Sequence, residues 1–496
     1  MHHRPGLMGV LGCRFRRWLS ILLGFALHLV ALLPVAGQSG FDDWSEPVVL
    51  TPDAGVVAFS PVAVADSTGY LHVVWTEAEG TGENRSFTSI YYASFDVRSW
   101  SMPIDIAVSA PGLAMSFLKG FVVTETGLLA VTWAEGQDIR MAVAPAASAN
   151  SAQAWRVRRV ANGVNPSLAA TPDGSRWYLA YWSETTTLVV SVSEDEGLTW
   201  DAPQTVWAAE DGTAGSNVTA LVGNDGALNL VWTEAAEARS WSGVAIWYGR
   251  LDPSTSEASV RQVSRSASLD EPTLDGPNIT ACPNGQLHIV WNNGVGSDTG
   301  RFHQWYDPDS GRWSQVAAVF PGLSGQTGKP GLVCDNTGRV HLLTSAQGGA
   351  AGGGLHYATW IDGTWSDYVT LWGGAYDGER PSMVILGGNE LHLLWQVFDL
   401  DGQRVDSIAH TMRAVEALRE EPRIAASIPV PSTIGPVTAT FPGAVGDKDV
   451  PATPAVSQPA VPQAAARTVL HPLLIATGVT LGLVAISVPF ARSRRR

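Results

Sequence analysis

A strand-like segment resembling Leu-His-Val-Val-Trp recurs seven times along the chain, each time just after a turn that contains Gly or Asn. The first copy spans residues 71–75, and later copies include LNLVW at 228–232 and LHLLW at 391–395. Successive copies are 49 to 59 residues apart, anchored at Trp75, Trp133, Trp182, Trp232, Trp291, Thr344 and Trp395. A self-similar period of this length indicates a repeat architecture.

Each copy is one of four short strand-like runs. An apolar run and a hairpin-type turn precede it, a second run such as SIYYASF follows, and most repeats close with a Trp-led run such as SWSMPIDI. Helical periodicity is missing. The pattern predicts an all-β fold, a seven-bladed β-propeller of four-stranded blades over residues 42–416. The last repeat, from Pro381, supplies only three strands, and Trp44–Leu50 copies the fourth, so this N-terminal strand is expected to close the ring.

The stretch Ser193–Trp200, SEDEGLTW, matches Ser-x-Asp-x-Gly-x-Thr-Trp and resembles the Asp-box, or BNR repeat, of the sialidase (neuraminidase) superfamily. In such a turn the Ser193, Asp195 and Thr199 side chains bond backbone N–H groups, Gly197 adopts a positive φ and Trp200 packs into the blade. The resemblance implies a scaffolding motif on the face away from the active site. Calcium binding or catalysis by Asp195 is the disfavoured alternative.

The resemblance also implies a catalytic apparatus of three arginines, a Tyr–Glu nucleophile and an acid/base Asp. The first arginine belongs to an Arg-Ile-Pro motif in the first blade, where this chain has Ser60-Pro61. The nearest relative of that motif is Arg380-Pro381 in the last repeat. Sialidases have six blades, whereas this chain has seven repeats. Both departures weaken the prediction of an enzyme.

Four copies of the repeat end in Trp-x-Glu, which places Glu77, Glu135, Glu184 and Glu234 at the end of a second strand, toward the expected ligand face. Two close carboxylates could hydrolyse a glycosidic bond, or hard oxygens could bind Ca²⁺. Repetition favours a third interpretation, in which each carboxylate accepts backbone or Trp N–H bonds, because catalytic pairs need separated pKa values.

Other candidate residues are histidines and cysteines. His72, His288, His341 and His392 share one strand position and are expected to be hydrogen-bonded structural residues, not metal ligands. Besides Cys13 near the N-terminus, the chain has only Cys282 and Cys334, each at the end of a first strand in neighbouring repeats. Two buried thiols are the favoured interpretation, and a disulfide is the alternative, because neighbouring inner strands can be too far apart for a bridge. No metal site or cofactor is expected.

The two ends of the chain carry export and membrane signals. Arginines followed by the apolar run 18–35 predict a signal peptide over residues 1–37. The Pro-rich stretch 421–467 is typical of an extended, disordered linker. Residues 468–491 form an uncharged run long enough for a transmembrane helix, and the Arg-rich tail 492–496 is expected to stay in the cytoplasm. The sequence thus predicts a single-pass type I protein of the cell membrane, with the propeller outside.

The net charge of the chain limits the classes of partner that it can bind. The chain has 46 acidic and 31 basic residues, and eight of the arginines lie in the terminal segments, so the exported portion is strongly acidic. This argues against nucleic acid as a partner. Arg85, Arg239 and Trp241 in the longer loops suit an extracellular glycan or protein. We therefore expect a non-catalytic recognition or adhesion module. The alternative is an exo-acting, sialidase-like glycoside hydrolase with a rearranged site that uses Glu77, Arg380 and Arg404.

Overall fold

The computed structural model describes residues 43–420, apart from residues 52–56, 80–85, 111, 117, 237–242, 256, 267–272, 295–298, 324, 347–353, 373–377 and 398–406. The predicted signal peptide, linker, membrane helix and basic tail lie outside the described residues, as do Arg85, Arg239, Trp241 and Arg404. In the described part of the chain, no helix is long and apolar enough to cross a membrane. The chain divides into two units, Met1–Ile428 and Pro429–Arg496, and the fold below is that of the first.

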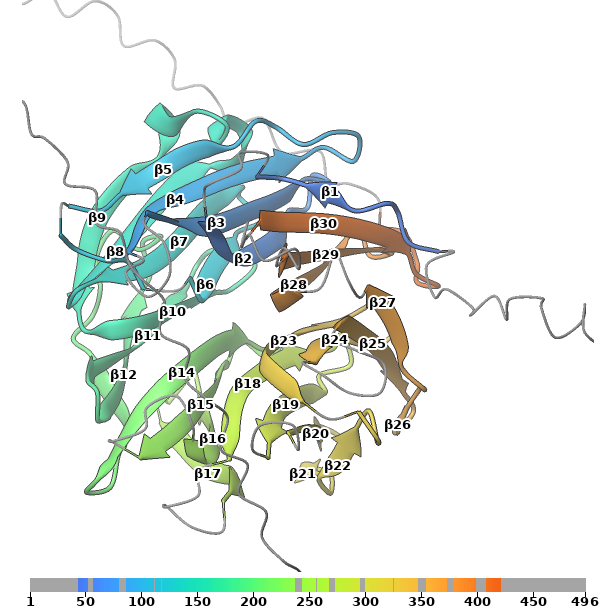
Figure 1. Cartoon of the computed structure of the whole chain (residues 1–496). Coiled ribbons are helices and arrows are strands. Elements are labelled where there is room, and N and C mark those ends of the chain that lie inside the picture. The colour runs from blue at the N-terminus through green and yellow to red at the C-terminus, as the bar shows by residue number, and fades with distance from the viewer. Residues whose placement is uncertain are drawn as a thin grey trace, which may run out of the picture. The chain divides into compact units, whose positions relative to one another are not determined.

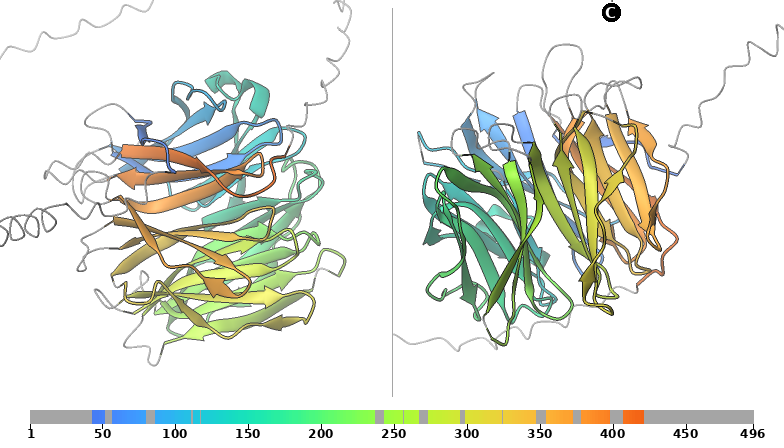
Figure 2. Two further views of the ribbon diagram at one scale, coloured as in Figure 1. Left: turned by 90° about the vertical axis from the view of Figure 1, so that its right-hand side faces the viewer. Right: turned by 90° about the horizontal axis from the view of Figure 1, so that it is seen from below.

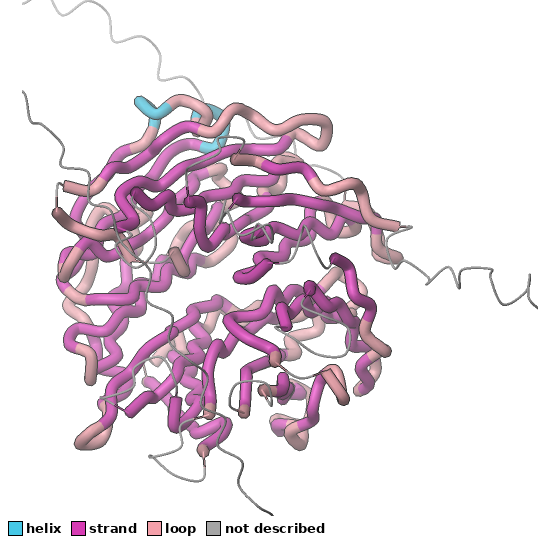
Figure 3. The backbone as a smooth tube through the Cα atoms, in the orientation of Figure 1, coloured by secondary structure: helices cyan, strands magenta, loops and turns pink. Residues whose placement is uncertain are grey.

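The protein is all-β, and its strands form antiparallel sheets in chain order (Figures 1 and 3). Two four-stranded sheets come first: β2 (Val57–Ala65), β3 (Leu71–Glu79), β4 (Ser86–Phe95) and β5 (Ile104–Val108), then β6 (Gly120–Val123), β7 (Leu128–Glu135), β8 (Asp138–Pro145) and β9 (Arg156–Asn162). A third follows: β10 (Val164–Ala170), β11 (Trp177–Glu184), β12 (Thr187–Ser193) and β13 (Gln204–Ala208). Two 3-10 turns, Ala146–Ser148 and Ala152–Ala154, precede β9.

The next sheet has nine strands, but a single residue pair, Gly243 with Leu274, joins its two halves. The first half holds β14 (Thr213–Val222), β15 (Leu228–Ala236), β16 (Gly243–Leu251) and β17 (Ala258–Arg265). The second holds β18 (Leu274–Ala281), β19 (Leu287–Asn293), β20 (Gly300–Asp307), β21 (Arg312–Trp313) and β22 (Ala317–Val319). Each half therefore repeats the plan of the four-stranded sheets.

The ring closes through the two ends of the described chain. The last sheets are β23 (Gln326–Cys334), β24 (Val340–Ala346), β25 (Gly354–Ile361), β26 (Thr364–Trp365) and β27 (Val369–Trp372), then β28 (Gly378–Leu386), β29 (Glu390–Val397) and β30 (Ser407–Ala414). β1 (Val48–Val49) pairs antiparallel with β30, and the blue N-terminal strand lies beside the orange C-terminal one in Figure 1. The predicted closure by the N-terminal strand is confirmed.

The first strand of each sheet is its innermost strand, and these strands contact one another in sequence. β2 contacts β6, the contacts continue through β10, β14, β18 and β23 to β28, and β28 returns to β2. The side views in Figure 2 show the sheets standing side by side around this ring. The arrangement is that of a β-propeller.

The hydrophobic core lies between sheets and not within one. Each apolar cluster combines residues of two neighbouring sheets, and one of them joins Trp75 of β3 to Leu394 and Ile408 of the last sheet. The repeated tryptophans at positions 75, 133, 182, 232, 291 and 395 are all almost fully buried. Trp182 lies so close to the next sheet that a Cβ on Gly215 would be 1.8 Å from its ring. Each sheet therefore depends on its neighbours for burial.

The sixth repeat has Thr344 in place of the tryptophan, and a buried arginine lies beside this threonine. Thr344 is fully buried, and Arg301 of β20, also fully buried, donates from Nη2 to the Thr344 hydroxyl. The same guanidinium donates from Nη1 to the Gly328 carbonyl, 3.1 Å away. A buried cation is tolerated here because backbone and hydroxyl oxygens accept its hydrogen bonds.

The Asp-box forms the predicted scaffold turn between β12 and β13. The Asp195 carboxylate accepts bonds from the Ser193 hydroxyl at 2.8 Å and from the Thr199 N–H and hydroxyl at 2.8 and 2.6 Å. These bonds, those of Thr199 foremost, lower the pKa of Asp195 to about 2. Gly197 has φ of 74°, and a Cβ there would lie 2.6 Å from Met141 of the neighbouring sheet. Only glycine suits both the φ and the contact.

The repeated histidines are structural, as predicted. His72 and His341 each bond a tyrosine of the next strand and an aspartate of the preceding turn. His288 and His392 each bond a second histidine, His303 at 3.0 Å and His410 at 2.9 Å. A tryptophan of the adjoining sheet, Trp365 or Trp100, donates to that second histidine in turn. These two histidine pairs therefore connect neighbouring sheets.

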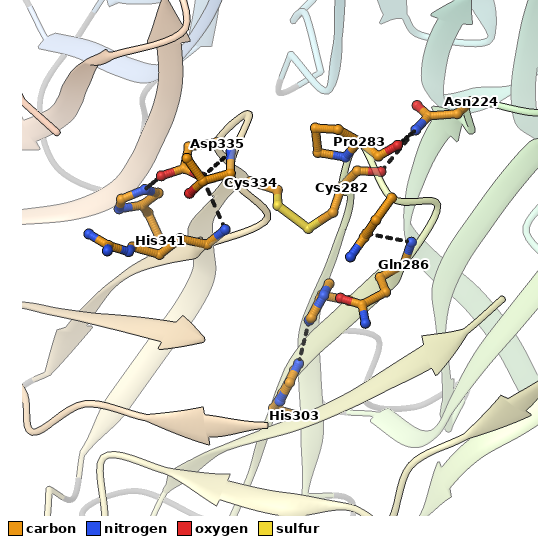
Figure 4. The surroundings of a disulfide bond; sticks show 12 residues. Asn224, Cys282, Pro283, Gln286, His303, Cys334, Asp335 and His341 are labelled. Atoms are coloured by element: carbon orange, nitrogen blue, oxygen red, sulfur yellow. Dashed lines mark hydrogen bonds and ion pairs between the residues drawn. A yellow bond between two sulfur atoms is a disulfide. The ribbon is translucent and has the colours of Figure 1, made fainter. Parts of the chain in front are cut away.

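Cys282 and Cys334 form a disulfide, so the favoured prediction of two free thiols is wrong (Figure 4). Their Cα atoms are 5.2 Å apart, within the range that a bridge requires. Both cysteines lie at the ends of innermost strands, β18 and β23, where the ring brings neighbouring backbones close enough for a bridge. The bond covalently joins two neighbouring sheets.

The last described residues run across the face that carries the turns between first and second strands. The Asn336 side chain donates to the Leu418 carbonyl at 2.6 Å, and the Glu420 N–H donates to the Gly387 carbonyl at 2.8 Å. Glu420 also lines a 610 Å³ cavity at the centre of this face, together with Asp66, Glu125 and Asp335. We call this side of the ring the turn face.

Replacing both cysteines, Cys282→Ser with Cys334→Ser, is expected to lower the free energy of unfolding by about 2–4 kcal/mol, because the unfolded chain loses a cross-link over 52 residues. Urea denaturation with and without reductant measures this, and reductant should have no effect on the double variant. Alkylation of both thiols in the unreduced native protein would contradict the bridge.

Stability should fall as the pH drops below about 6.5, because burial lowers the pKa of His288 to about 3 and of His392 to about 4, and those of His303 and His410 well below the usual value. Below this pH the histidines bind protons in the unfolded state but not in the folded state. Each histidine therefore lowers the free energy of unfolding by up to about 1.4 kcal/mol per pH unit. Denaturation midpoints at pH 7, 6 and 5 test this.

The fourth repeat supplies the matched control. At the positions of His288 and His303 it has Asn229 and Tyr248, which a 2.7 Å hydrogen bond joins and which do not titrate near neutral pH. The double variant His288→Asn with His303→Tyr should therefore lose stability less steeply on acidification than the parent. An unchanged slope would show that these histidines do not cause the acid sensitivity.

Candidate functional site

A β-bulge occurs near the start of most innermost strands. The register shifts once in β2, β10, β14, β18, β23 and β28. Residues with positive φ occupy these bulges: Ser60, Asn165, Asn217, Gly276, Gly328 and Arg380. Bulges re-aim side chains and are frequent beside functional sites. Positive φ is strained for an arginine, and Arg380 has φ of 54°.

These bulges lie at the end of the ring opposite the turn face, where they bring side chains of distant sheets together. Lys119 precedes β6, and its Nζ donates to Oδ1 of Asn217 in β14 at 3.1 Å. The Asn217 amide then donates to Oδ1 of Asp275 in β18 at 2.8 Å. Strands β6 and β14 are not neighbours in the ring, so the first bond spans part of the axial region.

Two further cations, Lys329 and Arg380, complete what we call the axial cluster: Lys119, Asn217, Asp275, Lys329 and Arg380. Burial, the largest cause, and the charges of Lys329 and Arg380 lower the pKa of Lys119 to about 7, against the opposing charge of Asp275. Burial lowers the pKa of Lys329 to about 8. Both lysines are half-buried, so they keep contact with solvent.

Cations outnumber carboxylates here. The cations are Lys119, Lys329 and Arg380, together with the buried Arg301, whose charge acts on Asp275. Among the described residues, the carboxylates that interact with these cations are those of Asp275 and Glu379. Burial raises the pKa of Asp275 just as it lowers those of Lys119 and Lys329, so it opposes charge of either sign in the cluster. In a chain with 46 acidic residues, this concentration of positive charge suits an anion.

Lysine usage singles out the same place. The whole chain contains three lysines, Lys119, Lys329 and Lys448, and two of them belong to the axial cluster. Neither lysine was predicted as a site residue, because neither belongs to a repeated motif. The rarity of lysine, with Lys329-Pro330 resembling Arg380-Pro381, was the signal that could have found them.

Arg380 lies beside the position that lacks the family's arginine. Its guanidinium carbon is 4.3 Å from the centre of the Phe59 ring, next to Ser60 in the first sheet. The last sheet therefore brings a guanidinium to the first innermost strand, as the Arg380 candidate required. Burial lowers the pKa of Arg380, while Glu379 and Asp275 raise it.

Three of the four Trp-x-Glu carboxylates have structural partners. Glu77 accepts the Trp75 indole N–H at 3.0 Å, and Glu234 accepts that of Trp247 at 2.8 Å. Glu135 accepts the Ala110 N–H at 2.7 Å and pairs with Arg140. Glu184 is exposed. These bonds fit the favoured structural interpretation, and none joins two of the glutamates.

Metal binding has no support in the described ranges, where no group of three or more His, Cys, Asp and Glu side chains could hold an ion. The axial cluster itself is cationic and therefore unsuited to a metal.

Residues 34–289 match the model of the BNR repeat-like domain. The chain belongs to this BNR repeat-like family. The match confirms the resemblance to the sialidase superfamily that the Asp-box indicated. A comparison with curated protein sequences gives no match.

Several solved structures are similar to this BNR repeat-like protein at low identity. A PL25 ulvan lyase bound to -[GlcA(1-4)Rha3S]- is 14% identical, with a TM-score of 0.50 over 75% of this chain and 96% of that one. A Dyadobacter fermentans protein of unknown function gives 11% and 0.47, over 75% and 100%. The NanB sialidase of Streptococcus pneumoniae gives 12% and 0.43, over 75% and 70%. At such identities the likeness to the lyase shows the fold alone.

The lysine pKa values can be measured directly, because reductive ¹³C-methylation gives one signal for each of the three lysines, beside that of the N-terminal amine. The signals of Lys119 and Lys329 should titrate near pH 7 and 8, as burial of both side chains and the cations beside Lys119 require. Lys119→Arg and Lys329→Arg assign the signals. Three titrations near pH 10 would refute the buried cationic cluster.

Proposed function

We propose that this chain is an extracytoplasmic, seven-bladed propeller, held at the cell membrane by its C-terminal segment, that binds an acidic glycan at the axial cluster without hydrolysing it. The observation that carries the proposal is the convergence of Lys119, Lys329 and Arg380 from three different sheets. The blade number rests on the closed succession of innermost strands, and the anchor on residues 468–491.

The chemistry of the cluster favours an anionic sugar. Ammonium and guanidinium groups bind carboxylates through charge-assisted hydrogen bonds, which are stronger when solvent is partly excluded. The side chains of Asn217 and Asp275 are already joined in a chain of bonds, which would hold Lys119 in place for a ligand. The lyase of the same fold was solved with a saccharide, and from it we take only the ligand class, as part of this proposal.

Catalysis is the second candidate, and one observation favours it. Burial raises the pKa of Asp275, which is the direction of shift that a general acid requires. Glu379, the residue before Arg380, supplies another carboxylate, and its charge acts on Arg380. The previously predicted use of Glu77 is less suitable, because its carboxylate accepts the Trp75 indole N–H. We place catalysis second because the cations of the cluster outnumber its carboxylates.

The test is calorimetric binding of sialyl- and uronate-terminated oligosaccharides to the full chain. Lys119→Gln, Lys329→Gln and Arg380→Gly should each weaken binding about 10- to 100-fold, the effect of losing one charged hydrogen bond. Arg380→Gly keeps the positive φ. Lys448→Gln and Asn165→Gly are matched controls for a lysine and for a bulge residue outside the cluster, and both should bind normally.

The same samples are assayed for release of sugar. Binding without turnover supports the proposal. Turnover that Asp275→Asn abolishes would establish the catalytic alternative, and equal binding of neutral sugars would refute recognition by charge.

A further inference from the structure

A second cavity lies between two neighbouring sheets at the turn face, away from the axial cluster. It measures 720 Å³, and its lining comes from β14–β17 on one side and β18–β21 on the other. Tyr248 and Arg261 belong to the first wall, Tyr306 and Trp313 to the second, and Asn284 lies in the turn between β18 and β19. A volume of this size accommodates a small ligand such as a disaccharide. We call it the seam cleft.

Arg261 has aromatic neighbours and no carboxylate partner among the described residues. Its guanidinium carbon is 3.9 Å from the centre of the Trp313 ring and 5.8 Å from that of Tyr248. Nη2 donates to Oε1 of Gln304 at 2.7 Å, whereas the buried Nε donates to no described residue. Burial lowers the pKa of Arg261 to about 10. The cleft therefore contains a partly desolvated positive charge without a counter-ion.

Arg250, in the same cleft, provides the contrast. Its Nη2 is 2.8 Å from Oδ2 of Asp225, so its charge is balanced. The net charge of the lining is positive because Arg261 has no such partner there. An uncompensated guanidinium at a cavity wall favours an anionic ligand.

Trp313 offers a second unused donor. It stands in the repeat at the position of Trp200 and Trp365, whose indole N–H groups donate to the Gly197 carbonyl and to His303 at 3.1 Å each. The Trp313 indole makes ring contacts with Tyr248 and Tyr306, but its N–H has no acceptor in the described part of the chain. Unlike Trp200 and Trp365, Trp313 is thus left with a free hydrogen-bond donor beside Arg261.

We propose that the seam cleft binds an acidic saccharide, with the sugar carboxylate paired to Arg261 and a ring oxygen or hydroxyl accepting from Trp313. The amide of Asn284, the hydroxyl of Ser259 and the phenol of Tyr306 in the lining suit sugar hydroxyls. The seam cleft and the axial cluster lie at opposite ends of the ring, so this site does not depend on the proposed axial function.

The test uses the full chain carrying Lys119→Gln and Lys329→Gln, which disables the axial cluster, with digalacturonate as the probe. Digalacturonate should bind, and one indole N–H signal in the ¹⁵N NMR spectrum, absent from Trp313→Phe, should shift. Arg261→Gln should weaken the affinity at least 10-fold, whereas Arg312→Gln, which removes an exposed arginine outside the lining, should not. Galactobiose, the neutral counterpart, should not bind.

Several outcomes would overturn the assignment: no shift of the Trp313 signal at millimolar digalacturonate, equal binding of galactobiose, or unchanged affinity in Arg261→Gln. If Arg261→Gln does not fold, the Trp313 shift and the comparison with galactobiose decide alone. Loss of binding in the Lys119 and Lys329 background, with binding in the parent, would support the axial site and refute the cleft.

Discussion

Burial between neighbouring sheets is the constraint on which the whole structure depends. No sheet here has a core of its own: Trp182 packs on Gly215 of the next sheet, and Trp75 on Leu394 and Ile408 of the last one. A sheet with two apolar faces needs a neighbour on each side, so only a closed ring leaves no face exposed. The pairing of β1 with β30 and the disulfide between Cys282 and Cys334 reinforce a closure that burial already requires.

The repeat made most of the fold predictable, because each blade has the same sequence pattern and the same packing requirements. Apolar alternation, hairpin turns and the Trp anchor predict four strands in each repeat, and the Asp-box predicts the geometry of one turn. The disulfide was not predictable in the same way. Its formation depends on how closely the ring draws two strand ends together, a distance that no local sequence specifies. The burial of Arg301 beside Thr344 is likewise a compensation between sheets.

The candidate site was less visible for the opposite reason: its residues are the exceptions to the repeat. Lys119, Lys329 and Arg380 occupy strand starts where other repeats have Ser60, Asn165 or Asn217. A search for periodic patterns does not detect positions that differ between repeats. The Trp-x-Glu residues repeat, and the structure explains their repetition by indole and backbone bonds that stabilise strand ends. The repeated residues are therefore scaffold residues, whereas the residues of the candidate site are departures from the repeat.

The path of the last described residues has a mechanical consequence. Because Asn336 and Gly387 bind Leu418 and Glu420 on the turn face, the chain beyond residue 420 starts from that face. A pull on the C-terminus would load the backbone of the last sheet, whose outer strand is the N-terminal one, and would act at the end of the ring remote from the axial cluster. Glu420 and the axial cluster thus lie at opposite poles of the ring, so a force applied at Glu420 does not act directly on the cationic side chains.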